Sequence, residues 1–232
     1  MVLNLYFDDF QATPFYEQIK LCQDPWEILK VIPNLVFEKN KSDIFGTFIS
    51  GDVFIGDDVK IYPTAVIEGP VYIGNGTIIR PHTWIRPNSI IGENCVIGKG
   101  SEIKNVFIFN NAKIGSNCFV GDSILGKGAR VGSNVVLANR RFDQKDIMIK
   151  VNGQKVSTGT DKFAAVIGEY SRIGASCVTS PGTLIGKHSW ITSGLSIHGV
   201  IPSDKLVMGK VNLELKDKER VELKHKDFKG VI

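Results

Sequence analysis

Residues 71–103 read VYIGNGTIIRPHTWIRPNSIIGENCVIGKGSEI, and an isoleucine returns at every sixth position. The spacing holds over most of residues 53–137, with a smaller or β-branched residue two positions before each aliphatic one. A period of six fits neither an amphipathic helix nor a simple alternating strand. It indicates a solenoid in which each unit is a short strand plus a corner, and stacking buries the isoleucines as an internal ladder. The sequence therefore predicts an all-β parallel β-helix.

The regular spacing is disturbed in three places. It loses one residue between Ile103 and Ile108 and again between Val120 and Leu125. Irregularities in sheets are frequent near functional sites, although a harmless deletion leaves the same mark. Residues 138–163 then leave the array, and Asn-Gly at 152–153 between two β-favouring runs predicts a protruding hairpin. The repeats resume at Ile167, so the β-helix is expected to span 46–210 with a loop at 138–163.

The two ends of the chain lack the repeat. Thr13-Pro14 and Asp24-Pro25 are typical helix openings, and they predict short helices over about 14–21 and 25–32. Residues 1–45 are therefore expected to form a helical N-terminal cap over an exposed solenoid end, with Trp26, Leu29 and Ile32 packing on the first coil. Residues 211–232 are expected to form a C-terminal surface tail or a short helix.

Composition narrows the function classes. The net charge of +4 is mild and its charges are interspersed, which argues against a nucleic-acid partner. No apolar run reaches the roughly 20 residues that span a bilayer, and the N-terminus does not resemble a signal peptide. The four cysteines lack CxxC spacing, and three of them fill the small position of the repeat, where a thiol packs as a small hydrophobe. We therefore expect a cytoplasmic protein, with no membrane contact and no metal site.

One column of charges stands out. Glu68, Arg86 and Lys104 are eighteen residues apart, which places them on consecutive turns of a three-sided coil. Adjacent like charges repel, so two stacked cations are best tolerated where an anion or a carboxylate joins them. The column indicates either an anion site or a solvated surface row of little energetic consequence.

Beyond the repeat, several motifs carry a family resemblance: Glu102-Ile-Lys-Asn, Val120-Gly-Asp-Ser, Asn139-Arg-Arg-Phe-Asp and Val151-Asn-Gly-Gln-Lys-Val-Ser-Thr-Gly. They resemble the C-terminal domain of bifunctional sugar-1-phosphate nucleotidyltransferases/amino-sugar-phosphate acetyltransferases, within the left-handed β-helix (hexapeptide-repeat) acyltransferases. The resemblance implies a left-handed helix, a homotrimer with sites between subunits, and acetyl-CoA or another acyl-CoA as co-substrate. It implies sugar-phosphate binding by Arg86, Lys104 and Asn139. It also implies a coenzyme A cleft lined by Ser133, Ala175 and Ser193, with Lys210 as the basic residue at its end.

The chain departs from the family at the catalytic position. Where the family has a histidine base, the frame Gly115-Ser-Asn-Cys-Phe-Val-Gly-Asp122 has Ser116, and Phe119 and Arg130 replace a tyrosine and an asparagine. A serine hydroxyl does not accept a proton near neutral pH without a base of its own, so the catalytic residue is not assigned. Two functions stay open. One is a coenzyme A-dependent acyltransferase acting on a sugar phosphate or nucleotide sugar. The other is a non-catalytic trimer that binds such a ligand, or a scaffold for a separate nucleotidyltransferase.

Overall fold

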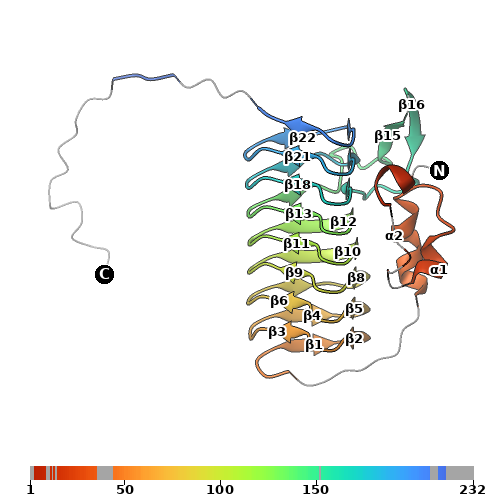
Figure 1. Ribbon diagram of the computed structural model, residues 1–232, viewed down its shortest axis with the longest axis vertical. Helices are drawn as coiled ribbons and strands as arrows, with labels where there is room; N and C mark the ends of the chain where they lie inside the picture. Colours follow the sequence, from red (N-terminus) through yellow and green to blue (C-terminus); the bar gives the residue numbers. More distant parts are fainter. Residues whose placement is uncertain are drawn as a thin grey trace.

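The computed structural model describes residues 3–8, 11, 13, 15–35, 44–151, 153–209 and 214–217. Its body is a left-handed parallel β-helix, a three-sided prism of stacked turns (Figure 1). In the part of the chain that is described, no helix is long and apolar enough to cross a bilayer. Of the expected C-terminal tail only residues 214–217 are described, and they are exposed and without helix.

The three sides of the prism are named faces 1, 2 and 3 in the order in which each turn visits them. Face 1 stacks β1 (Phe48–Ser50), β4 (Val66–Glu68), β7 (Trp84–Ile85), the first part of β10 (Glu102–Ile108) and of β12 (Phe119–Leu125), β14 (Val136–Leu137), β19 (Val178–Thr179) and β22 (Ser196–Ile197). Face 2 stacks β2 (Val53–Ile55), β5 (Val71–Ile73), β8 (Ser89–Ile91), the second part of β10 and β12, β17 (Ala165–Ile167), β20 (Thr183–Ile185) and β23 (Val200–Ile201). Face 3 stacks β3 (Lys60–Ile61), β6 (Ile78–Ile79), β9 (Val96–Ile97), β11 (Lys113–Ile114), β13 (Arg130–Val131), β18 (Arg172–Ile173), β21 (Trp190–Ile191) and β24 (Leu206–Val207).

The isoleucine ladder forms as the period predicts. Ile67, Ile85 and Ile103 are fully buried and stand in register on adjacent turns. The smaller position of the repeat is buried beside them, and Cys95, Cys118 and Cys177 occupy it as free thiols, which confirms their packing role. Each rung thus contributes apolar surface that only its neighbours above and below can cover, which is why the repeat must stack to be stable.

The N-terminal helices are shorter than expected. They are η1 (Leu3–Leu5), α1 (Tyr16–Ile19), α2 (Glu27–Val31) and the 3₁₀ turn η2 (Ile32–Asn34). Phe15 has a left-handed conformation, with φ of 64°, so α1 begins only after it. The Glu27 carboxylate accepts hydrogen bonds from the backbone N–H groups of Gln23 and Asp24, which is one half of a capping box at the start of α2.

The described part of the N-terminal segment does not cover the end of the solenoid, so the expected packing of Trp26, Leu29 and Ile32 on the first coil is wrong. It lies along face 2, beside the middle of the prism (Figure 1). The outward side chains of this face are apolar, and Ile90, Phe107 and Ile124 are completely buried under the segment. Phe7 stacks on Phe109, and Trp26 contacts Phe163 edge-on, with ring centroids 4.8 and 6.3 Å apart.

The loop between β14 and β17 contains the expected hairpin. β15 (Met148–Val151) pairs antiparallel with β16 (Gln154–Ser157), and Gly153 in the turn has φ of 84°. Ile147 and Ile149 are buried in the same cluster as the N-terminal segment. The loop therefore projects from the prism and is also tied to the segment that covers face 2 (Figure 1).

Candidate functional site

The two lost residues of the repeat fall at one corner, where face 1 meets face 2. In an undisturbed turn, Pro87 and Asn88 form this corner, whereas the next two turns use a single residue each, Asn105 and Asp122. Both single residues have left-handed backbone conformations, with φ of 47° and 48°. Asn and Asp tolerate this region better than other side chains that have a Cβ. The tight corner is what lets β10 and β12 run continuously across both faces.

Asp122 is the centre of a polar cluster at this corner, and it is 3% exposed. Its Oδ1 accepts a hydrogen bond from Asn105 Nδ2 at 2.7 Å, and its Oδ2 accepts one from Asn139 Nδ2 at 2.5 Å. Lys104 Nζ lies 3.7 Å from Oδ2. The buried carboxylate thus has both amide donors and a cation near it, which a buried charge requires.

The column of charges predicted from spacing forms, and carboxylates join its cations. Arg86 pairs with Glu102 at 2.8 Å and also lies over the ring of Trp84. Lys104 pairs with Asp122, as described above. Glu68 does not pair with Arg86; it accepts a hydrogen bond from Trp84 Nε1 at 2.7 Å.

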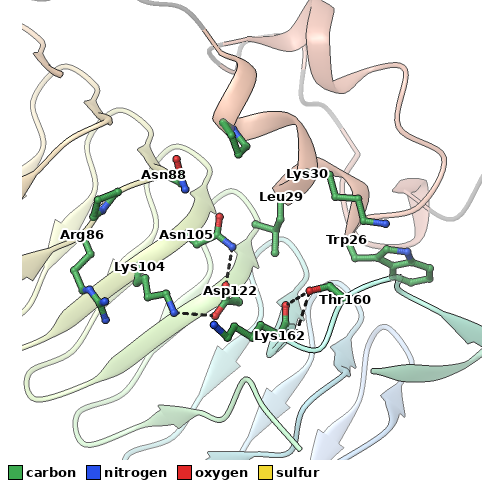
Figure 2. Close-up of a pocket in the computed structure, with 12 residues that line it drawn as sticks. Trp26, Leu29, Lys30, Arg86, Asn88, Lys104, Asn105, Asp122, Thr160 and Lys162 are labelled. Atoms are coloured by element: carbon green, nitrogen blue, oxygen red, sulfur yellow. Dashed lines mark hydrogen bonds and ion pairs between the residues drawn. The ribbon is translucent and has the colours of Figure 1, made fainter. Parts of the chain in front are cut away.

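A cavity of about 450 Å³ opens at this corner. The β-helix contributes Arg86, Lys104, Asn105 and Asp122 to its lining. Other lining residues come from α2, from the residues beside it and from the loop (Figure 2). They are Trp26, Leu29, Lys30, Pro33, Thr160 and Lys162. The cavity thus contains four cationic side chains and, among the described residues that line it, one carboxylate.

Asn139 reaches the cavity indirectly. It follows β14, where the loop leaves the β-helix, and its amide orients the Asp122 carboxylate. On the other side of Asn139, a second cavity of about 630 Å³ is lined by Ala138, Arg140, Phe142, Val178 and their neighbours. Asn139 therefore contacts a residue of the first cavity, and its two chain neighbours line the second.

Ser116 and three of the expected cofactor residues share a different corner, where face 3 meets face 1. Ser133 Oγ accepts a hydrogen bond from the Ser116 backbone N–H at 3.2 Å. Ala175 and Ser193 continue the column on the turns that follow, because the backbone of each lies against a glycine of the turn below. The structure thus brings together Ser116, Ser133, Ala175 and Ser193, but it separates them from Arg86 and Lys104 by the width of face 1. Lys210 lies outside the described residues.

Neither Ser116 nor any described histidine lines the 450 Å³ cavity. His82 and His188 are corner residues with positive φ, and His198 follows β22. His225 lies outside the described residues. Among the residues that the structure describes, no group of histidine, cysteine or acidic side chains has the arrangement of a metal site.

Sequence reasoning missed the roles of three charged residues of the cavity, Lys30, Asp122 and Lys162. The role of Asp122 depends on the register that brings it beside Asn105. The two residues lost from the repeat were the sequence signal for this change of register. Lys30 and Lys162 reach the cavity only because the N-terminal segment lies on face 2. The signal for that placement was the apolar outward column of face 2, which includes Tyr72, Ile90, Phe107 and Ile124.

A β-helix of six-residue repeats with a cationic cavity at one corner defines a hexapeptide-repeat protein. Residues 50–154 match the family model described as "EIF2B subunit epsilon LbH domain", and residues 165–198 match "Hexapeptide repeat of succinyl-transferase". The chain belongs to the left-handed β-helix, hexapeptide-repeat acyltransferase family.

Individual relatives agree with this assignment. A "Bifunctional protein GlmU" of Methanococcus aeolicus is 37% identical over 215 residues, which cover 84% of this chain and 48% of the relative. A "Bifunctional sugar-1-phosphate nucleotidylyltransferase/acetyltransferase" of Sulfurisphaera tokodaii is 36% identical over 179 residues, 75% of this chain and 45% of the relative. An "Uncharacterized acetyltransferase YaiX" of Escherichia coli is 34% identical over 154 residues, 66% of this chain and 67% of the relative. The chain spans about half the length of the bifunctional relatives.

Proposed function

We propose that this protein is a coenzyme A-dependent acyltransferase whose acceptor is a sugar phosphate or a nucleotide sugar. The observation that carries the proposal is the corner cavity, in which Arg86 and Lys104 lie beside the buried Asp122. The cations suit a phosphate, because charge-assisted hydrogen bonds are the strong ones. Asp122 suits the neutral part of the acceptor, because a carboxylate offers more lone pairs than Asn105 and Asn139 use. Asn139 holds Asp122 in place from the side where the loop begins.

The donor belongs on face 1. Ser133, Ala175 and Ser193 form a corner of small side chains, and Lys210 is proposed to extend the cleft at its end. From that corner, face 1 continues through the exposed Val136 and Val178 to the second cavity beside Asn139. This apolar path suits the arm of an acyl-CoA, with the acyl group delivered toward Asn139. Such a donor and four buried free cysteines fit a cytoplasmic protein.

A homotrimer is part of the proposal. Ser116 and the Arg86–Lys104 pair lie on opposite edges of face 1, so a second copy is needed to bring the family's catalytic position to the phosphate site. Face 2 is covered by the protein's own N-terminal segment, which leaves faces 1 and 3 for contacts between copies. Light scattering on the purified protein should give three times the mass of the chain.

The test combines binding with turnover. Acetyl-CoA is titrated calorimetrically into the protein, and thiol release is followed with phosphorylated and nucleotide-linked sugars as acceptors. Arg86→Ala and Lys104→Ala should each weaken acceptor binding. The double substitution should cost less than the sum, because both residues act on one phosphate. Strict additivity would contradict a shared site, and a wild type that does not bind acetyl-CoA would contradict an acyltransferase.

A second candidate function is a non-catalytic trimer that binds a sugar phosphate or nucleotide sugar, or a scaffold for a separate nucleotidyltransferase. One observation favours it. The family's base is replaced by Ser116, and no described histidine lines the cavity. Ligand binding without thiol release from any of the tested acceptors would support this function over the first.

A further inference from the structure

Two lysines outside the family motifs line the cavity with Arg86 and Lys104. Lys30 comes from α2, and Lys162 comes from the end of the loop. Figure 2 shows Arg86 and Lys30 at the two ends of the cavity. We propose that these four cations bind a diphosphate, the pyrophosphate group of a nucleoside-diphosphate sugar. This inference rests on the proposed function and specifies its acceptor.

The balance of cations and carboxylates in the cavity favours a ligand with two phosphates. Glu102 pairs with Arg86, and Asp122 pairs with Lys104. Among the described residues, Lys30 and Lys162 have no carboxylate within ion-pairing distance. The site thus carries about two unbalanced positive charges. Lys30 lies across the cavity from the paired cations, whereas Lys162 extends toward Asp122 (Figure 2). A sugar monophosphate concentrates its charge on one phosphorus, whereas a diphosphate distributes it along the cavity.

The backbone of Lys30 is held in place by its neighbours, and its exposed side chain extends toward the loop. Trp26 packs edge-on against Phe163, and Leu29 is buried, so α2 is held against the β-helix one turn from Lys30. Lys30 Nζ lies only 3.1 Å from the place that a Cβ on Gly159 would occupy, and Gly159 has φ of 67°. A residue without a side chain at this bend lets the ammonium group approach the loop.

The cavity also has apolar surface that suits the uncharged part of the ligand. Leu29, Pro33 and Pro87 line the same cavity and offer apolar surface beside the cations. A volume of about 450 Å³ is within the range of pockets that enclose a whole small ligand. A nucleoside-diphosphate sugar uses both features, because its charged centre is flanked by a sugar at each end.

The experiment compares ligands with one and two phosphates by calorimetric titration. UDP-glucose, UDP, inorganic pyrophosphate and glucosamine 1-phosphate are titrated into wild type, Lys30→Gln and Lys162→Gln. Each substitution should weaken UDP-glucose and UDP about tenfold, the usual loss for a hydrogen bond between charged groups. Glucosamine 1-phosphate should change less than about twofold. Lys150→Gln, at an exposed lysine on β15 that does not line the cavity, is the matched control and should change nothing.

Any other result of these titrations would overturn a particular part of the proposal. Equal weakening of the one- and two-phosphate ligands would overturn the diphosphate assignment, and no weakening would overturn the role of Lys30 and Lys162. Pyrophosphate that binds as tightly as UDP-glucose would overturn the nucleotide-sugar assignment. In these cases the proposed function would still be supported by two results. One is the loss of acceptor binding caused by Arg86→Ala and Lys104→Ala, and the other is the binding of acetyl-CoA. A wild type that binds no phosphorylated ligand would overturn both.

Discussion

Asn105 and Asp122 occupy equivalent corners of adjacent turns, and the Asn105 amide donates to the Asp122 carboxylate at 2.7 Å. Their backbones are nearly identical, with φ of 47° and 48°. In a strict repeat two residues would fill each of these corners, and neither side chain would have this position. The one-residue loss in each turn therefore creates the site.

Asp122→Asn should destabilise the protein by about 1–3 kcal/mol. The new amide group would face the amide donors of Asn105 and Asn139, and Lys104 would lose its carboxylate. Urea denaturation measures the free energy of unfolding. Asp161→Asn, which removes the exposed partner of Arg140, is the control and should cost less than about 1 kcal/mol. Equal costs for the two variants would contradict a central role for Asp122.

Ile91→Ala should cost about 2–5 kcal/mol, because it removes most of a fully buried side chain from the ladder. Val136→Ala is the matched control, since Val136 points outward on face 1 and is 39% exposed. It should cost less than about 1 kcal/mol. The measurement is thermal and urea unfolding of both variants. A melting temperature of Ile91→Ala within a degree of wild type would show that the ladder is not the core.

Ser116→His should raise the rate of amino-sugar acetylation by roughly one to two orders of magnitude, because it supplies a general base. Adding Phe119→Tyr should raise it further, because the family's tyrosine helps to place the acceptor. Thiol release with glucosamine 1-phosphate measures the rate, which should be low in wild type. Ser116→Ala should leave it low, and Lys104→Ala should abolish the gain. No gain despite bound coenzyme A would favour the non-catalytic function, and high wild-type turnover would reveal another base.

Glu169→Gln should raise the melting temperature at pH 7–8 by about 2–4 °C. Glu169 is buried beneath the N-terminal segment, and its Oε1 has no hydrogen-bond partner among the described residues. Burial raises the pKa of this carboxyl above its usual value, and it outweighs the hydrogen bond from the Asp8 backbone and the charges of Lys127 and Lys187, which act in the opposite direction.

The direction of the pH dependence follows from that shift. Because the pKa is higher in the folded state, the protonated carboxyl stabilises the fold at pH values below its ordinary pKa. This contribution is lost as the pH rises through the folded-state pKa. The advantage of Glu169→Gln should therefore disappear near pH 4. Glu214→Gln, at an exposed position, should have no effect at either pH. An advantage that persists at pH 4 would show that charge is not the cause.

The sequence predicted what the repeat itself determines. Ile85 and Ile103 are in the core because six-residue spacing points them inward, and Arg86 and Lys104 stack because they follow these isoleucines. The hairpin around Gly153 forms because its turn residues are local signals. Each of these features depends on neighbours in sequence or on one fixed period.

The features that sequence reasoning missed depend on contacts that the six-residue repeat does not predict. The contact between Trp26 and Phe163, or the approach of Lys30 to Gly159, joins residues that are far apart in the chain. The inward ladder says nothing about what covers the outward side of a strand. Only the apolar character of Phe107 and Ile124, on the outside of face 2, indicated that another segment must lie there.

The placement of the N-terminal segment has a consequence for how the protein is made. Phe7 and Trp26 leave the ribosome first, but Phe109 and Phe163, on which they pack, are synthesised much later. Until the middle turns exist, these aromatic side chains have no native partner, and exposed apolar surface on an incomplete chain favours aggregation. The turns add one after another through contacts between neighbouring rungs, whereas docking of the segment closes a long loop. The cavity is thus completed only after the solenoid has formed, and a chain that stalls before residue 162 contains Lys30 but lacks Lys162 and the loop side of the site.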